Sequence, residues 1–204
     1  MLTVPSLIQK YEKQVYITQL KKAYSEVSQA LQLYMSDNAA TTLTEAGMNS
    51  QVAVNEFTEK YFKNAKVCNR EDSNKCFCKV YKRLDGTNFN ESTGTAFMNS
   101  KSYILSNGCA IKFNYKFSNN KILNFHIDIN GRKGPNTLGK DRFGIYVYNN
   151  GRLDDIFGES ANNLGNAPLS KDEREESFET YCFTNGTAGC FGKILNDNWQ
   201  INYY

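Results

Sequence analysis

The first part of the chain carries apolar residues at helical spacing. Between Leu2 and Tyr34 an apolar side chain returns every three or four positions, and lysine, glutamate, glutamine and serine fill the positions between them. This period is typical of an amphipathic helix with one face to bury. At about 1.5 Å per residue the helix is roughly 50 Å long, so we expect it to extend beyond a compact domain.

A second helix is predicted for residues 41–66, although its apolar spacing is weaker. The polar residues 35–40 separate it from the first helix, and Phe57 lies on its apolar face. Thr42 or Thr44 can accept hydrogen bonds from the first N–H groups of this helix, which predicts its start.

From Cys68 onward the pattern changes to a period of two, which is typical of β-strands with one covered face. The predicted strands are residues 76–82, 103–106, 109–117, 122–129, 142–148 and 199–203. Asn107 and Gly108 predict a hairpin turn of type I′ between the second and third of these strands. Short turns between successive strands indicate an antiparallel meander with one covered face.

Helices precede strands along the chain, an order typical of an α+β fold with segregated layers. We expect the long helix to cover the sheet. Residues 1–34 form this helix and residues 35–204 the globular part, together one structural domain. Residues 150–177 are predicted as loop, and the charge run at residues 171–179 as a solvated loop or a short helix.

The composition agrees with a folded domain. The chain has 204 residues, of which 40% are hydrophobic and 13% aromatic, which is enough for a core. A net charge of +3 permits weak attraction to polyanions but does not require it. The chain contains no apolar run long enough to cross a bilayer and no complete signal peptide.

The cysteines indicate disulfides rather than a metal site. They are Cys68, Cys76, Cys78, Cys109, Cys182 and Cys190. A zinc site is disfavoured because the chain has only 1 histidine and no paired CxxC units. An even number of cysteines in a loop-rich chain predicts three disulfides formed in an oxidising compartment.

Signatures of catalysis are sparse, and we expect no enzyme activity. His126 lies beside Asp128 on the polar face of a predicted strand, without a nucleophile elbow, and we expect its side chain to be exposed. No P-loop, HExxH or dinucleotide-binding pattern occurs. Asp154 and Asp155 are adjacent in a predicted loop, where we expect them to be solvated, with unshifted pKa values.

The loop from Asp128 to Asp141 has two interpretations. Asp128 and Asn130, followed by Gly131, match the opening of oxygen-rich calcium loops, although the complete EF-hand pattern is missing. In the first interpretation Asp128, Asn130 and Asp141 bind Ca²⁺ together with backbone carbonyls. In the second, these side chains hydrogen-bond the backbone of a turn.

Several segments in a fixed order carry a family resemblance. They are VPSLI at residues 4–8 with YITQLKKAYSEVSQA at 16–30, DINGRKGPN at 128–136 followed by Gly139 and Asp141, and GCFGKIL at 189–195 with WQINY at 199–203. Together they resemble type IV pilins and the pseudopilins of type II secretion. The resemblance covers most of the chain and is loosest at residues 86–100 and 151–177. The processing site of that family, its acidic residue near the mature N-terminus and most of its apolar stem do not precede these segments, so we expect Met1 to be an introduced start.

The resemblance implies a ladle-shaped fold and a structural role. The long helix would be the handle, anchored in the bacterial inner membrane before assembly, and the globular heads would face outward in an extracellular or periplasmic filament. In such a filament the stems pack together, so the residues Leu2, Val4, Leu7, Ile8 and Tyr11 would contact other subunits, and residues from about Val15 onward would pack on the sheet of the same subunit. Lys10, Lys13, Lys21 and Lys22 would lie near lipid headgroups or between subunits, or form a solvated helix face.

The resemblance also guides the expected pairing of cysteines and the expected partners. Cys182–Cys190 would bracket a C-terminal loop as in many pilins, Cys68–Cys76 would close the loop after the second helix, and Cys78–Cys109 would then join two strands. A filament of this kind serves adhesion, motility, secretion or DNA uptake, so other pilin subunits, DNA or a host surface are expected partners, and a small-molecule substrate is not. The alternative from another class is a secreted, disulfide-stabilised binding module or a small extracellular enzyme.

Overall fold

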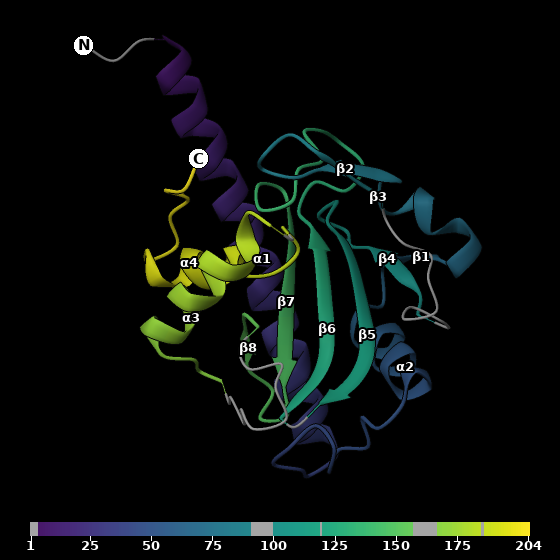
Figure 1. Cartoon of the computed structure of the whole chain (residues 1–204). Helices are drawn as coiled ribbons and strands as arrows, with labels where there is room; N and C mark the ends of the chain where they lie inside the picture. The colour runs from purple at the N-terminus through teal and green to yellow at the C-terminus, as the bar shows by residue number, and fades with distance from the viewer. Residues whose placement is uncertain (1–3, 91–99, 119, 157–166, 185) are drawn as a thin grey trace.

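The computed structural model describes residues 4–90, 100–118, 120–156, 167–184 and 186–204. A long helix lies behind an antiparallel sheet, and the N-terminal part of this helix projects beyond the body (Figure 1). The predicted α+β class is confirmed, with the long helix preceding the antiparallel sheet, although the short helices between Lys171 and Asn196 follow the last strand. Within the described residues, no helix combines the length and the apolar character that crossing a membrane requires.

The sheet has six strands in the order β1-β4-β5-β6-β7-β8, and β2 pairs with β3 in a separate two-stranded sheet. The strands are β1 (Lys66–Cys68), β2 (Val80–Lys82), β3 (Asn88–Asn90), β4 (Ser102–Ile104), β5 (Ala110–Ser118), β6 (Lys121–Asp128), β7 (Arg142–Tyr148) and β8 (Leu153–Asp154). The helices are α1 (Val4–Asp37), α2 (Gln51–Tyr61), the 3-10 helix η1 (Arg70–Lys75), α3 (Lys171–Ser177), the π-helix η3 (Phe178–Cys182) and α4 (Cys190–Asn196).

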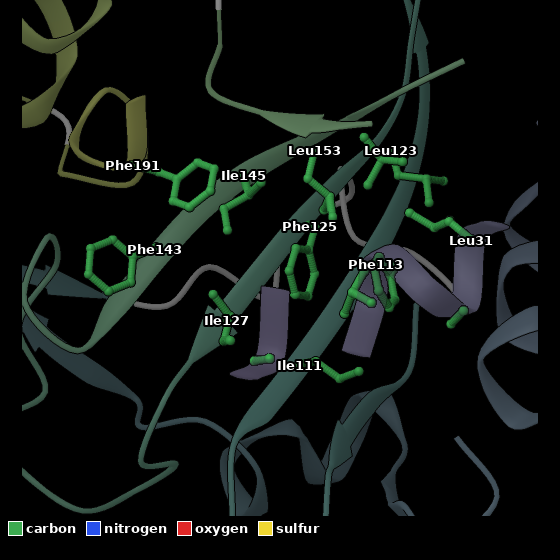
Figure 2. Close-up of a cluster of buried hydrophobic side chains, with 14 of the residues drawn as sticks. Leu31, Ile111, Phe113, Leu123, Phe125, Ile127, Phe143, Ile145, Leu153 and Phe191 are labelled. Carbon is green, nitrogen blue, oxygen red and sulfur yellow. The ribbon is translucent and has the colours of Figure 1, made fainter. Parts of the chain in front are cut away.

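The apolar face of α1 covers the sheet, as predicted. Its buried residues recur every three or four positions, and they include Ile17, Leu20, Ala23, Val27 and Leu31. Val15 is half-buried, so burial of the helix begins slightly later than predicted. Figure 2 shows Leu31 beside the core side chains of the sheet. Each fully buried leucine stabilises the contact by roughly 1.5–3 kcal/mol.

The central strands supply the other half of this core. Phe113 of β5 pairs with Phe125 of β6, which pairs with Ile145 of β7, and all three point to the same side (Figure 2). The rings of Phe113 and Phe125 stack with centroids 4.7 Å apart. The predicted alternation is therefore confirmed, except that Phe117, beyond an irregularity in the pairing of β5 with β6, is exposed.

The opposite face of the sheet is also covered in part, contrary to the prediction of one covered face. A second cluster of buried side chains lies there, comprising Cys68, Cys76, Phe77, Tyr81, Ala110 and Leu138. Arg142 is buried beside it, with its guanidinium carbon 4.5 Å from the ring centroid of Tyr81 and 5.4 Å from that of Phe77. Because alternation distinguishes only apolar from polar positions, it did not reveal a second layer built on a buried arginine.

The second helix is shorter than predicted and starts elsewhere. Its N-cap is Ser50, whose hydroxyl accepts a hydrogen bond from the N–H of Ala53. The predicted cap Thr44 instead donates its backbone N–H to the side chain of Asn149, 3.0 Å away. Thr42 lies in the same turn and donates its N–H to Glu45. The hydrogen bond between Thr42 and Glu45 forms a turn after α1, and the hydrogen bond between Thr44 and Asn149 joins this turn to the end of β7.

Two local predictions near the turns are wrong. Asn107 does not adopt the positive φ that a type I′ turn requires, because its side chain accepts a hydrogen bond from the N–H of Cys109, and only Gly108 has φ of 88°. Residues 199–203 form no strand, since Asn198 and Trp199 have φ of 53° and 62° and turn the chain back toward α1.

Candidate functional site

The projecting part of α1 carries an apolar surface that the other described residues of the chain leave uncovered. Leu7, Ile8 and Tyr11 are 49%, 54% and 72% exposed. Positions four apart share one side of a helix, so Leu7 and Tyr11 lie together with Ile8 beside them. Of the other residues predicted to contact subunits, Val4 begins α1 and Leu2 lies outside the described residues. This uncovered surface is the candidate site for contact with other molecules.

The C-terminal residues hold α1 at the point where it leaves the body. Tyr24 of α1 packs edge-on against Trp199, with ring centroids 5.1 Å apart. Further along, Lys13 donates to the main-chain oxygen of Tyr204. The hydroxyl of Tyr203 donates to the carbonyl of Gly139 at 2.6 Å. The projecting helix is thereby fastened to two loops of the body.

Two of the three predicted disulfides are present, Cys68–Cys76 and Cys182–Cys190. The disulfide Cys182–Cys190 encloses a loop that contains Thr187. This loop packs directly on β7, since a side-chain carbon added at Gly144 would overlap the carbonyl oxygen of Thr187. The bond thus fixes a loop against the sheet, and the loop continues into α4.

The third predicted bond, Cys78–Cys109, is wrong, and both residues are free thiols. Cys109 is buried in the core between the sheet and α1, and its sulfur donates to the carbonyl of Ile129 at 3.1 Å. Cys78 packs against the cluster on the opposite face, with its sulfur 3.1 Å from the side-chain oxygen of Asn136. A bond between them is excluded because the sheet separates the two sulfurs.

The free thiols can be counted chemically. We expect the native, unreduced chain to react slowly at Cys78, which is half-buried, and to protect Cys109, because burial raises the pKa of Cys109 to about 12. Denaturation without reductant is expected to expose both thiols, giving two alkyl groups per chain by mass spectrometry. A chain that takes up no label after denaturation would show that a third disulfide exists.

The loop between β6 and β7 brings the predicted metal ligands together. The amide nitrogen of Asn130 donates to the carboxylate of Asp141 at 3.4 Å, and its backbone N–H donates to Asp128 at 3.3 Å. The other oxygen of Asp128 accepts the hydroxyl of Tyr81 at 2.7 Å. Both oxygens of Asp141 accept backbone N–H groups, from Asn136 at 2.7 Å and from Thr137 at 2.6 Å. This is the hydrogen-bonded turn of the second interpretation.

The same loop fits Ca²⁺ poorly as it stands. The ion takes six to eight oxygen ligands. Among the side-chain oxygens of these three residues, only Oδ1 of Asn130 is buried with no hydrogen-bond partner in the described part of the chain. The described residues contain no cluster of three or more histidine, cysteine, aspartate or glutamate side chains suited to a metal. Calcium binding stays a prediction from the sequence, and the donors already bonded to both carboxylates oppose it.

Titration with Ca²⁺ separates the two interpretations. We expect no binding heat and no change of melting temperature relative to the chain in chelator, because protein donors already satisfy Asp128 and Asp141. The Asp141→Asn variant serves as the matched control. A melting temperature that rises with Ca²⁺ in the original chain and not in the variant would establish the calcium site.

Burial of the two carboxyl groups makes stability depend on pH. Burial, and then the charge of Asp141, raise the pKa of Asp128 to about 8. The folded chain therefore retains a proton that the unfolded chain releases near pH 4, so stability falls as pH rises between these values. Between about pH 6.5 and 8 we expect a loss of roughly 1.5 kcal/mol in the free energy of unfolding.

The Asp128→Asn variant tests whether Asp128 causes the loss of stability with rising pH. It keeps an oxygen for the hydroxyl of Tyr81 but cannot ionise, so its stability should no longer fall across the same pH range in urea titrations. The Asp172→Asn variant, in an exposed position of α3, should retain the original slope. Equal slopes in the Asp128→Asn variant and the original chain would contradict the assignment.

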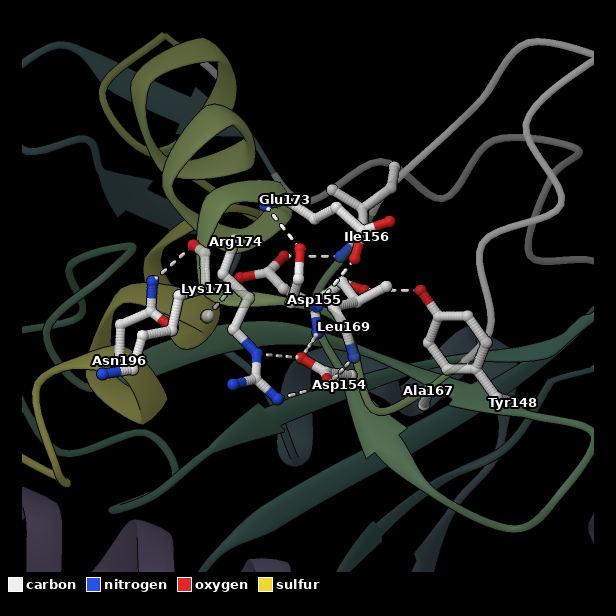
Figure 3. A network of polar contacts seen from close by, with 12 residues as sticks. Tyr148, Asp154, Asp155, Ile156, Ala167, Leu169, Lys171, Glu173, Arg174 and Asn196 are labelled. Carbon is white, nitrogen blue, oxygen red and sulfur yellow. Dashed lines mark hydrogen bonds and ion pairs between the residues drawn. The ribbon is translucent and has the colours of Figure 1, made fainter.

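The adjacent acids of the predicted solvated loop are in fact buried, and Figure 3 shows the network around them. The carboxylate of Asp154, in β8, accepts two hydrogen bonds from the guanidinium of Arg174, in α3, at 2.8 Å and 2.6 Å. The predicted charge run therefore contains a helix whose arginine points toward the sheet. Asp155 accepts the N–H groups of Gly189 at 2.7 Å and Gly192 at 2.5 Å. Burial raises the pKa of Asp155 to about 6, although these hydrogen bonds oppose the shift.

His126 is half-buried rather than exposed. It lies between Lys112 of β5 and Gly144 of β7 in the registers of the sheet. Burial lowers the pKa of His126 well below its ordinary value, and the charges of Arg142 and Lys112 lower it further. The imidazole is therefore neutral at neutral pH. Its strand neighbour Asp128 hydrogen-bonds Tyr81 instead of orienting the imidazole.

Comparisons with protein-family models, with characterised proteins and with solved structures gave no match for this chain. The functional argument therefore depends on the chain's own residues. The sequence pattern revealed the apolar residues of α1, but it missed Lys140 and Tyr204, which lie beside Lys13 at the base of the projection. No local signal links these positions, because they meet only in the folded chain.

Proposed function

We propose that this chain is a structural subunit of a bacterial filament of the type IV pilin or type II secretion pseudopilin class. The observation that carries the proposal is the division of α1 into two parts. One part is buried on the sheet from Ile17 onward, and the other projects with Leu7, Ile8 and Tyr11 exposed. A subunit that packs its stem among other stems needs this division.

The arrangement of the body supports the same proposal. The disulfide Cys182–Cys190 fixes the start of α4, and the C-terminal residues follow this helix. Tyr204, among these residues, contacts the base of the projecting helix by accepting a hydrogen bond from Lys13. Contacts made by the projecting helix are therefore coupled mechanically to a rigid head. In the proposed role, adhesion, motility, secretion or DNA uptake are functions of the assembled filament, and the single subunit performs no chemistry.

Filaments sheared from the source cells and identified by mass spectrometry test the proposal. We expect this chain in the sheared fraction, and we expect the double variant Leu7→Asp/Ile8→Asp to be folded but absent from it, because charges are costly in a packed stem bundle. The matched control is Val52→Asp, at a position of α2 that is 63% exposed, which should still assemble. A freely secreted chain, found in no filament, would favour the binding module or the small enzyme instead.

A further inference from the structure

A small pocket opens on the face of the sheet that α1 does not cover, where β5 ends and β6 begins. Its volume is about 150 Å³. The three central strands, which lie side by side in Figure 1, supply its described lining of Lys116, Ser118, Lys121, Asn124 and Tyr146. This lining contains lysines and neutral polar side chains but no carboxylate.

An irregularity in strand pairing brings one lysine to this pocket. Leu123 of β6 is buried in the core against α1, so regular alternation would point Lys121 to the same side. The pairing of β6 with β7 shifts between these two residues. Lys121 lines the pocket instead, with its nitrogen 5.8 Å from the ring centroid of Tyr146. Irregular pairing of this kind re-aims a side chain, and here it places a charge on the polar face of the sheet.

Asn114 is an independent indication of a polar ligand. It is 2% exposed, and neither its side-chain oxygen nor its side-chain nitrogen has a hydrogen-bond partner among the described residues. A buried amide without partners is costly, and a bound ion or water is a common explanation for one. Asn114 pairs in register with Asn124, which pairs with Tyr146, and Lys116 is two positions further along β5. The amide therefore lies beside the pocket lining.

The charge around the pocket favours an anion. Lys116 is exposed, and Lys121 is only 6% exposed. Asp154 of β8 pairs in register with Tyr146, but its carboxylate already accepts two hydrogen bonds from the guanidinium of Arg174. This carboxylate is therefore neutralised by another partner. Two ammonium groups at one small pocket attract an anion.

The size and the donors of the pocket narrow the choice of anion. Sites for drug-sized ligands have volumes of roughly 300–1,000 Å³, so this pocket is suited to a single small group. The amides of Asn114 and Asn124, the hydroxyl of Ser118 and the two ammonium groups can all donate hydrogen bonds. Phosphate and sulfate present more acceptor oxygens to such donors than a carboxylate does.

We propose that this pocket binds a tetrahedral oxyanion, either free phosphate or sulfate or the same group in a small ester. Lys116 and Lys121 supply the positive charge, and the amides of Asn114 and Asn124 donate hydrogen bonds to the oxygens. The oxyanion pocket, meaning the five lining residues and Asn114, shares no residue with the projecting part of α1. It is therefore independent of the proposed function.

Calorimetric titration of the full chain, in a buffer without phosphate or sulfate, tests the oxyanion pocket. We expect inorganic phosphate to bind saturably and to raise the melting temperature. The Lys116→Gln variant should raise the dissociation constant about tenfold, which is the effect of losing one hydrogen bond to a charged group. The matched control is Lys79→Gln, which removes an exposed lysine just before β2 and should bind normally.

The Asn114→Leu variant tests the buried amide. Without phosphate it should be at least as stable as the original chain, because it removes a buried polar group that lacks a partner. With saturating phosphate the melting temperature of the original chain should rise more than that of the variant. An equal rise in both would overturn the assignment of Asn114 to the pocket.

Methyl phosphate and methyl sulfate distinguish the two sources of the oxyanion. Tighter binding of either ester than of inorganic phosphate and sulfate would identify an ester as the ligand, and the reverse order would identify the free ion. The inference is overturned if none of these probes binds saturably, if acetate binds as tightly as they do, or if Lys13→Gln abolishes binding and Lys116→Gln does not. A chain that assembles into filaments without binding these probes refutes only the oxyanion pocket.

Discussion

Replacing Asp155 with alanine is expected to lower the free energy of unfolding by about 3 kcal/mol or more. The carboxylate is fully buried and accepts N–H groups from Ile156, Gly189 and Gly192, so the variant leaves three buried donors without their acceptor. The last two donors lie at the start of α4. We therefore expect the C-terminal region to unfold first, which urea titration combined with hydrogen exchange can measure.

Two variants control this experiment. Asp155→Asn keeps one acceptor oxygen and should fall between the original chain and the alanine variant. Asp172→Ala removes an exposed carboxylate of α3 and should change stability little. If the alanine variant at Asp155 were as stable as the one at Asp172, the network in Figure 3 would not hold α4 to the sheet.

The second large effect is expected at Gly144, where Gly144→Ala should destabilise the chain by roughly 3 kcal/mol. The added carbon would overlap the carbonyl oxygen of Thr187, a backbone atom in the loop that Cys182–Cys190 encloses. A loop held at both ends cannot move aside at little cost. The measurement is the midpoint of urea unfolding at constant slope.

Gly134→Ala is the matched control, because the nearest atom to its added carbon is 4.0 Å away. Releasing the loop provides a second check. In the background Cys182→Ser/Cys190→Ser, the alanine at Gly144 should cost less than in the disulfide-bonded chain, which a double-mutant cycle detects. An equal cost in both backgrounds would mean that the disulfide does not fix the loop over Gly144.

Periodicity predicted the elements that bury a regular face. The helical spacing of Leu20, Val27 and Leu31 was sufficient, and so was the alternation of apolar and polar residues along the strands that carry Phe113 and Phe125, because each residue's neighbours on the same element indicate which face is buried. The long helix and the central strands were accordingly predicted with small errors at their ends.

The polar interior was not predictable in this way. Asp155 and Arg174 look like surface residues in the sequence, because most of the groups that satisfy them lie far along the chain: Asp154 is 20 positions from Arg174, and Gly192 is 37 positions from Asp155. Arg142 and Asp128 resemble the solvated side of a strand for the same reason. Burial of a charge depends on partners brought by the whole fold, and a local pattern contains no information about them.

The cysteines show the same limit. Cys68–Cys76 and Cys182–Cys190, which the resemblance implied, each join residues separated by 8 positions. The pairing of Cys78 with Cys109 followed from assuming that every cysteine is bonded. It failed because the sheet places one thiol in each of two clusters, on opposite faces.

Cross-linking from the projecting helix tests the central claim most directly. A photoreactive amino acid at Ile8, introduced in the source cells, should give a ladder of products in which this chain is joined to filament subunits, other copies of itself included. The same group at Val52 should give far fewer such products. Ladders of filament subunits from Ile8 are the predicted result, and a chain that stays monomeric, or joins only a protein outside any filament, would contradict the account.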